Sequence, residues 1–267
     1  MKKKIFDIIS ALLVISILAF IFIQLSPGDP AENYLRASHL PITDELLKQK
    51  REELGLNSPL VVQYLKWLKN VLLGNFGYSF LRKEPAIYLT FKSLYATFQL
   101  TIFSTFLIIL ISLPIGILSA VKTGTWIDKI IISITTIFVS MPVFWLGFSL
   151  ILLFSVKLNW LPVSGRGGFL NFVLPSITLS VPFIGQYIEF IKKSILENIQ
   201  NNLLENAKLR GLKKRYIIFN YLLKGAWIPI LSGFSFTFIS ILTGSILVEE
   251  IFSWPGIGFL FTKAIQA

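Results

Sequence analysis

An apolar run in this sequence, SLYATFQLTIFSTFLIILISLPIGILSAV (residues 93–121), contains no aspartate, glutamate, lysine or arginine. It is longer than the roughly 20 residues that an α-helix needs to cross the hydrocarbon core of a bilayer. That core offers the backbone no water as a hydrogen-bond partner, so the run should form a helix. Over the whole chain 15% of the 267 residues are charged, against roughly 25% in soluble domains. The composition therefore indicates an all-α membrane protein.

Four further apolar runs are candidate membrane spans. They cover residues 8–23, 130–156, 167–188 and 225–248, and none contains an acidic or basic residue. The first run is followed by Ser-Pro-Gly-Asp-Pro instead of a small-residue cleavage site, so we expect a retained span and not a signal peptide. Together the runs predict a polytopic transmembrane helical protein with five spans. Prolines inside them should kink or break the helices at Pro114, Pro142, Pro175, Pro182 and Pro229.

The distribution of lysine and arginine predicts the orientation of these spans. Residues 192–224, between the fourth and fifth spans, hold eight Lys/Arg against two Glu, and Lys2–Lys4, Lys122 and Lys129 lie on the same side. Residues 26–92, on the opposite side, hold nine Lys/Arg and seven Asp/Glu, which nearly cancel. Basic loops stay in the cytoplasm, so the N-terminus is predicted to be cytoplasmic. Such loops explain the net charge of +11 without a nucleic-acid partner.

These spans divide the sequence into three parts. The first span occupies residues 1–25, an extracytoplasmic segment covers residues 26–92, and the transmembrane core covers residues 93–267. The core includes the cytoplasmic loop 192–224. Cysteine is absent from the sequence, so the chain has no disulfide framework and no thiolate metal site.

The extracytoplasmic segment should contain two short helices. PITDELLKQKREELGL (residues 41–56) predicts a helix that is capped by Thr43 or Asp44 and ended by Gly55. A second helix should begin at Pro59. Its apolar face suits either a helix lying on the membrane surface or one packed on the ends of the spans. That face consists of Val62, Leu65, Leu68 and Leu72.

The cytoplasmic loop contains two apolar stripes separated by a glycine. The first stripe repeats every four residues and predicts an amphipathic helix that continues the fourth span. It consists of Ile191, Ile195, Ile199, Leu203 and Ala207. Gly211 should end this helix, because glycine takes the positive φ of a helix C-terminus without a steric penalty. The second stripe begins at Leu212 and leads into the fifth span. The stripes either insert into a cytoplasmic partner, which we favour, or pack on the neighbouring spans.

Four segments carry a family resemblance. The loop contains Glu205-Asn206-Ala207, then Gly211, then Ile228-Pro229. The other segments are SPGDPAENYL (residues 26–35), LGNFGYSF (residues 73–80) and VEEIFSWPGIGFLFTKAI (residues 248–265). The first pattern resembles the "EAA" signature of membrane subunits of binding-protein-dependent ABC importers. The others resemble the branch of that family that imports dipeptides, oligopeptides and nickel chelates. Their order and spacing agree, so the resemblance covers essentially the whole chain.

The resemblance implies a helical permease that normally has six spans. Five spans would leave the C-terminal residues on the extracytoplasmic side. It also implies that the loop forms a coupling helix, which sits in a groove of an ATPase subunit and transmits its closure to the spans. The residues matched to this role are Glu205, Asn206, Ala207, Gly211 and Leu212, with Asn206 standing where the family has alanine.

The resemblance further implies a transport subunit and not an enzyme, in the cytoplasmic membrane of a prokaryote. The implied partners are a second homologous permease subunit, two ATP-binding subunits and an extracytoplasmic solute-binding protein. This sequence lacks the phosphate-binding motif G-x-x-x-x-G-K-[ST], so ATP and Mg are expected on the ATPase subunits and no cofactor on this chain. The chain would form half of a translocation pathway for peptides, with nickel or another metal chelate as the alternative substrate.

Polar residues within the predicted spans are candidates for lining this pathway. They are Gln99, Ser140, Gln186 and Ser240. Glu249 and Glu250 follow the fifth span and are expected to be solvated helix-end charges, with attraction of a cationic substrate or a receptor as the alternative. Glu189, at the inner end of the fourth span, should pair with Lys192 or Lys193 at helical spacing.

Two other classes of membrane protein are less consistent with the sequence. A membrane-embedded enzyme would need acidic or basic residues within its spans, and these spans have none. A stand-alone membrane scaffold would not need such residues, so it stays an alternative. A secondary transporter would use similar charges and often shows inverted repeats, which this sequence lacks. His39 is the only histidine, so a histidine-rich metal site is excluded. The sequence therefore favours a permease subunit.

Overall fold

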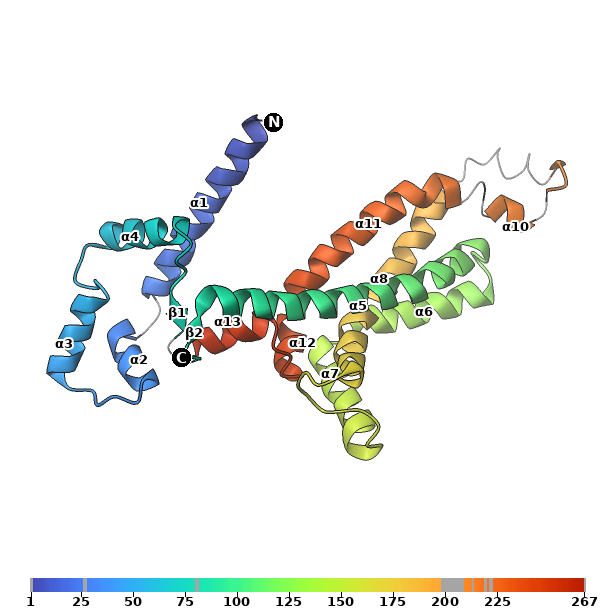
Figure 1. Cartoon of the computed structure of the whole chain (residues 1–267). Coiled ribbons are helices and arrows are strands. Elements are labelled where there is room, and N and C mark those ends of the chain that lie inside the picture. The colour runs from blue at the N-terminus through green and yellow to red at the C-terminus, as the bar shows by residue number, and fades with distance from the viewer. Residues whose placement is uncertain are drawn as a thin grey trace. The chain divides into compact units, whose positions relative to one another are not determined.

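The computed structural model describes residues 2–25, 28–79, 82–197, 209–212, 214–218, 220 and 223–266. Within these residues the chain forms two compact units. The first unit holds the residues before Lys92 together with Ile265 and Gln266, and the second unit holds Lys92–Ala264. Helices dominate both units, as Figure 1 shows, and the predicted all-α fold class is confirmed.

The described part of the first unit contains one long helix, three short helices and a two-stranded hairpin. The long helix is α1 (Lys2–Leu25), and the short helices are α2 (Pro30–Ala37), α3 (Asp44–Glu53) and α4 (Leu60–Leu72). The antiparallel strands are β1 (Tyr78–Ser79) and β2 (Glu84–Pro85). Helix α1 is long and apolar enough to cross a membrane, in agreement with the predicted first span.

Local sequence signals set the ends of the short helices. Asp29 caps α2 by accepting a hydrogen bond at 3.0 Å from the backbone N–H two residues later. Thr43 caps α3 as predicted, accepting a hydrogen bond from Leu46 N at 3.4 Å. Gly55 follows the end of α3 with a φ of +71°. An ion pair of 2.7 Å between Arg51 and Asp29 joins α3 to α2.

Helix α4 begins at Leu60, one residue after the predicted start at Pro59, and one of its faces packs on α1. Tyr64 Oη lies 2.9 Å from Ser16 Oγ, and Gln24 Nε2 donates to Gln63 Oε1 at 3.2 Å. Most of the predicted apolar face stays exposed, at Val62, Leu65 and Leu72. The contact with α1 is therefore made by Gln63 and Tyr64 and not by the predicted apolar face, so the structure does not show that face packed on a span.

The second unit is built from helices of very different lengths, of which α5 begins before Lys92 and α13 ends at Ile265, just outside the unit. They are α5 (Ala86–Val121), α6 (Trp126–Ser140), α7 (Val143–Leu150), the π-helical segment η1 (Ile151–Lys157), α8 (Phe169–Glu197), α10 (Lys214–Ile217), α11 (Leu223–Gly244), α12 (Ile246–Ile251) and α13 (Ile257–Ile265). Helices α5, α8 and α11 are each long and apolar enough to cross a membrane. Together with α1 they make four candidate spans among the described residues.

The third predicted span is broken in the middle. Helix α6 and the pair α7–η1 meet at a bend of 96°. Pro142 has no N–H, and its ring pushes the preceding Met141 out of the helical region, to a ψ of 122°. Counting the bent pair as one crossing gives the predicted five spans, and otherwise the described chain has four. The other prolines expected to kink or break spans lie within continuous helices.

Helix α8 lies at the centre of the second unit, packed against α6, α7 and α11. Its buried side chains include Leu174, Ile184, Ile188, Ile191 and Ile195. Glycines allow the close approaches at these crossings. A Cβ on Gly185 would lie 2.8 Å from the backbone oxygen of Thr135 on α6, and one on Gly233 of α11 would lie 2.5 Å from the ring of Phe190. Small residues at helix crossings are typical of membrane helix packing.

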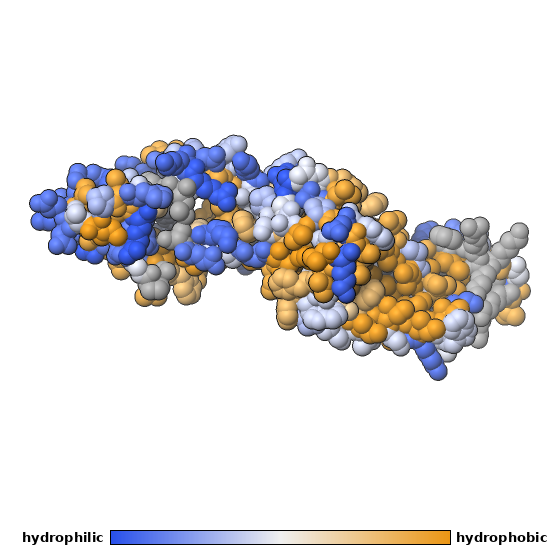
Figure 2. All heavy atoms as spheres, turned by 90° about the horizontal axis from the view of Figure 1, so that it is seen from below, coloured by the Kyte–Doolittle hydropathy of each residue, from blue (hydrophilic) through white to orange (hydrophobic). Residues whose placement is uncertain are grey.

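Apolar side chains also cover much of the surface of the second unit. Figure 2 shows hydrophobic residues exposed over a wide part of the face in view. Large examples are Phe106, Ile137 and Phe236, which are 57%, 57% and 73% exposed. Large contiguous apolar surfaces mark contact with a membrane or another protein. The surface thus agrees with the membrane environment that the composition predicts.

Candidate functional site

The predicted coupling residues fall in the sequence between the end of α8 and the start of α11. Glu205, Asn206 and Ala207 fall outside the described residues, so their role stays a prediction. Gly211 has a φ of +68°, the positive value that the sequence predicts for a glycine corner. A Cβ on this glycine would meet nothing within 4 Å, so the backbone conformation and not a lack of space favours glycine here. Leu212, beside it, is partly buried.

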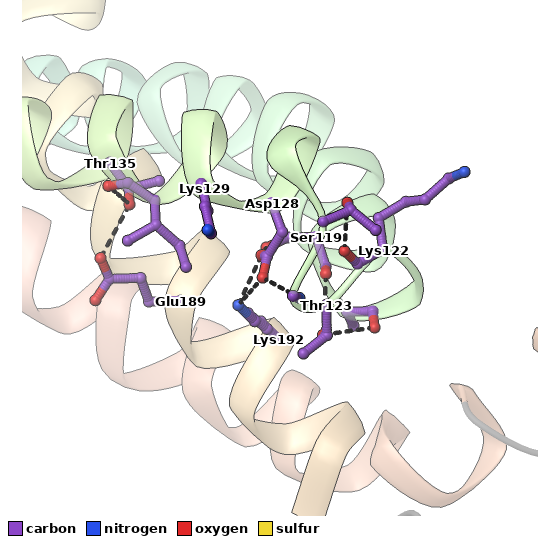
Figure 3. Close-up of polar contacts among 12 residues, drawn as sticks. Ser119, Lys122, Thr123, Asp128, Lys129, Thr135, Glu189 and Lys192 are labelled. Carbon is purple, nitrogen blue, oxygen red and sulfur yellow. Dashed lines mark hydrogen bonds and ion pairs between the residues drawn. The ribbon is translucent and has the colours of Figure 1, made fainter.

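A buried ion pair joins α6 to the end of α8 that leads into this loop (Figure 3). Lys192 Nζ lies 2.6 Å from Oδ1 and 2.8 Å from Oδ2 of Asp128. The side chains of Asp128 and Lys192 are 5% and 15% exposed. Asp128 also accepts hydrogen bonds from Ser119 Oγ on α5 at 2.6 Å and from Gly124 N at 3.0 Å. These four residues, called the Asp128 cluster below, join three helices at one carboxylate.

The turn between α5 and α6 places Asp128 for these contacts. Gly124 adopts a φ of +80°, which lets the chain reverse within a few residues. Asp128 then falls in the first turn of α6, where unpaired backbone N–H groups and the helix dipole favour a negative charge. Its carboxylate meets an ammonium, a hydroxyl and a backbone N–H. The charge is therefore fully compensated although it is buried.

The predicted pairing of Glu189 with Lys192 or Lys193 is wrong. Glu189 accepts a hydrogen bond from Thr135 Oγ1 on α6 at 2.9 Å, and Lys192 reaches across to α6. Lys193 lies 3.8 Å from Glu197 in an exposed pair. Helical spacing alone predicts pairs within α8, but α6 packs on the same face and offers buried partners. Buried charge-assisted contacts are stronger than exposed pairs one helical turn apart.

The four predicted pathway residues lie on four helices. They are Gln99 on α5, Ser140 on α6, Gln186 on α8 and Ser240 on α11. Ser140, Gln186 and Ser240 are exposed. Gln99 is half-buried and accepts a hydrogen bond from Arg166. An apolar cavity of about 710 Å³ between α5, α6 and α8 is lined by none of these four residues. Their role in a pathway therefore stays a prediction.

The expectation of a solvated Glu249 is wrong, because its side chain is fully buried. It accepts hydrogen bonds from Thr97 Oγ1 at 2.6 Å, Ser245 Oγ at 3.0 Å and Phe259 N at 3.0 Å. The chain turns back after α12 and covers the carboxylate, which the apolar pattern did not indicate. Glu250 keeps a side chain that is 31% exposed. We call Glu249 and its three hydrogen-bond partners the Glu249 cluster, which consists of Glu249, Thr97, Ser245 and Phe259. All three donors in this cluster are neutral.

The turn after α12 is fastened to α5. Trp254 is buried, and its Nε1 donates to a backbone carbonyl of α5 at 3.0 Å. Ile257 N donates to Thr97 Oγ1 at 2.8 Å. A Cβ on Gly256 would lie 2.3 Å from the carboxylate of Glu249, so the position accepts only glycine without a shift of its neighbours. The Trp-Pro-Gly-Ile-Gly motif thus has a packing reason.

The sequence patterns did not predict either cluster, although the sequence contains a partial signal for each. Asp128 stands three residues after Thr125, at a helix start where acidic residues are favoured. Ser245 precedes Glu249 by four positions, the spacing of neighbours on a helix face. No local pattern identifies Lys192 as the partner of Asp128, because the two residues are 64 positions apart.

Comparison with protein families matches most of the chain. The family described as "Binding-protein-dependent transport system inner membrane component" matches residues 112–267. A companion family, "Binding-prot-dependent transport system membrane comp, N-term", matches residues 1–102. The first match includes both arms of the Asp128–Lys192 pair and the predicted coupling loop.

Curated relatives match along the full length of the chain. A protein of Sinorhizobium fredii named "Probable peptide ABC transporter permease protein y4tP" is 32% identical, over 99% of this chain and 86% of its own length. The "Glutathione transport system permease protein GsiC" of Pectobacterium atrosepticum is also 32% identical, over 99% and 85%. The "Nickel import system permease protein NikB" of Staphylococcus aureus is 34% identical, over 100% and 80%. All three are named as permease proteins.

Two solved structures share part of the fold. An inward-facing structure of the MetNI methionine ABC transporter covers 67% of this chain and 80% of its own chain, with a TM-score of 0.53 at 22% identity. An amino acid ABC transporter crystallised with histidines covers 67% and 78%, with a TM-score of 0.54 at 18% identity. These likenesses concern the fold alone. The family matches and the full-length relatives show that the chain belongs to the binding-protein-dependent transport system inner membrane components, the permease subunits of ABC importers.

Proposed function

We propose that this permease subunit forms half of the translocation pathway of an ATP-driven importer for peptides. The observation that carries the proposal is the similarity over 99% of the chain to a probable peptide permease and to a glutathione permease. Glutathione is itself a short peptide, so both relatives point to one class of substrate. The apolar helices and exposed apolar surface of the second unit support a membrane-embedded role.

The proposed assembly contains a second homologous permease subunit, two ATP-binding subunits and an extracytoplasmic solute-binding protein. ATP and Mg would bind to the ATPase subunits, since the sequence has no phosphate-binding motif of its own. The complex would reside in the cytoplasmic membrane of a prokaryote, with the basic loop 192–224 on the cytoplasmic side. In this proposal the residues that contact the ATPase are Glu205, Asn206, Ala207, Gly211 and Leu212.

Import of a nickel chelate is the second candidate function. The nickel permease NikB is 34% identical over the whole of this chain, about as similar as the peptide permeases. A solute-binding protein that delivers the substrate would set much of the specificity. The choice between the two candidates therefore requires a transport measurement.

Uptake by cells of the native host tests the substrate. Deletion of this chain is expected to abolish uptake of a radiolabelled dipeptide, tripeptide or glutathione and to leave uptake of radioactive nickel unchanged. Restoring the chain from a plasmid should restore peptide uptake. Loss of nickel uptake with normal peptide uptake would replace the first candidate by the second.

The same assay tests the coupling loop. Gly211 has a φ of +68°, whereas the proline ring fixes φ near about −65°. A Gly211→Pro variant should insert into the membrane in normal amounts but fail to transport. Normal uptake by a well-expressed variant would contradict the coupling role of this loop.

A further inference from the structure

Lys192 of the Asp128 cluster lies near the last described residue of α8, the helix that precedes the predicted coupling residues in the sequence. Lys192 stands five residues before Glu197, the last described residue of α8, and residues 198–208 follow. A helix rises about 1.5 Å per residue, so Lys192 sits about 8 Å from that end on the same element. Helix α8 is continuous between these residues. A displacement of the end of α8 would therefore move Lys192 as well, because no break in the helix separates them.

Asp128 connects Lys192 to two further segments. Its Oδ1 accepts from Lys192 Nζ and Ser119 Oγ, and its Oδ2 accepts from Lys192 Nζ and Gly124 N. Ser119 belongs to α5, Gly124 to the turn and Asp128 to α6. One carboxylate thus fastens the neighbouring ends of α5 and α6 to α8.

Other contacts already hold α6 against α8. The missing side chain of Gly185 lets the backbone of Thr135 approach closely, and Thr135 donates to Glu189. The ion pair is therefore not required to bring these helices together. Its distinctive features are its burial and its place at the loop end of α8. Solvent weakens an exposed pair such as Lys193–Glu197 far more than a buried one.

We propose that Asp128 and Lys192 are a positioning pair for coupling, which carries the motion of the loop after α8 to α5 and α6. Neither side chain needs to touch the substrate or the ATPase. The pair makes the loop end of α8 move together with the turn between α5 and α6. This inference rests on the proposed function, because the motion originates in an ATPase bound to the loop.

The test measures transport and ATP hydrolysis together in the complete transporter, reconstituted in lipid vesicles. The variant is Asp128→Asn combined with Lys192→Met, because removing one partner alone leaves a buried charge uncompensated. The double variant should assemble and hydrolyse ATP. Substrate transported per ATP should fall about fivefold or more, the lower end of typical coupling between sites.

Two control variants separate coupling from the mere presence of a lysine on α8. Lys193→Met removes the neighbouring lysine, whose side chain is 73% exposed, and should leave the transport ratio unchanged. Lys192→Arg keeps the positive charge and can bind the carboxylate with two hydrogen bonds. The Lys192→Arg variant should therefore transport nearly as much substrate per ATP as wild type, unlike the neutral double variant.

The outcomes distinguish this inference from the proposed function. A double variant with the wild-type ratio overturns the positioning role and leaves the importer assignment intact. A double variant that fails to assemble also overturns it, because the pair would then be a requirement for folding. Wild-type vesicles that transport neither peptide nor nickel chelate, despite bound ATPase and solute-binding protein, would contradict the proposed function itself.

Discussion

Two buried carboxylates in the second unit are stabilised in different ways. Asp128 meets the ammonium of Lys192 from a helix far away in the sequence. Glu249 meets three neutral donors among the described residues, and two of them lie within ten residues of it in the sequence. A buried carboxyl group can thus be satisfied by a counter-ion from a distant helix or by hydroxyl and backbone N–H donors. The first arrangement joins α5, α6 and α8 through an ion pair, whereas the second joins the turn after α12 to α5 through neutral hydrogen bonds.

The largest expected effect comes from removing the charge of Asp128 alone. Asp128→Asn leaves the ammonium of Lys192 buried without a counter-ion, so the free energy of unfolding should fall by about 3–5 kcal/mol. Denaturant unfolding of the purified subunit in detergent measures this change. The neutral double variant described above should lie much closer to wild type. Equal losses in the two variants would show that charge compensation does not govern this cluster.

The next effect concerns the space around Glu249. In Gly256→Ala the new Cβ would lie 2.3 Å from the carboxylate, so the turn or the carboxylate must shift, at a cost of about 1–3 kcal/mol. Gly244→Ala is the matched control, since a Cβ there meets nothing within 4 Å. The unfolding midpoints of both variants measure the difference. A Gly256→Ala variant as stable as the control would show that the Glu249 cluster can accommodate an additional methyl group without cost.

A third variant tests whether the Glu249 cluster needs both acceptor oxygens of the carboxylate. Glu249→Gln keeps the shape but turns one acceptor oxygen into an N–H₂ group. That group must face either the hydroxyls of Thr97 and Ser245 or the N–H of Phe259. An unsatisfied buried donor should reduce the free energy of unfolding by about 1–3 kcal/mol. Unchanged unfolding of this variant would mean that packing and not hydrogen bonding holds the turn.

Local patterns in the sequence predicted the elements whose causes are local. The apolar runs anticipated α1, α5, α8 and α11, because length and hydropathy alone decide a membrane span. Thr43 and Gly55 marked the ends of α3, since caps act within one helical turn. Pro142 was expected to disturb its span, but the 96° bend also depends on how α7 packs on α8 and α12.

The two clusters depended on contacts between distant segments, which no local pattern contains. Helical spacing assigned Lys192 to Glu189, yet the packing of α6 on α8 gave it Asp128. Glu249 was expected in solvent because it follows an apolar run, yet the turn through Trp254 covers it. Sequence reasoning therefore anticipated the elements better than the partners of their charged side chains.

The smallest expected effect compares one hydroxyl donor in each cluster. Ser119→Ala removes a single donor from Asp128, which keeps Lys192 and the turn N–H, so the loss should be about 0.5–1.5 kcal/mol. Thr97→Val removes a donor to Glu249 and also the acceptor of Ile257 N. An N–H left unpaired should raise its loss to about 1–3 kcal/mol. Parallel unfolding curves of the two variants measure this order. A larger loss for Ser119→Ala would show that the Asp128 cluster, and not the Glu249 cluster, depends more on its hydroxyl.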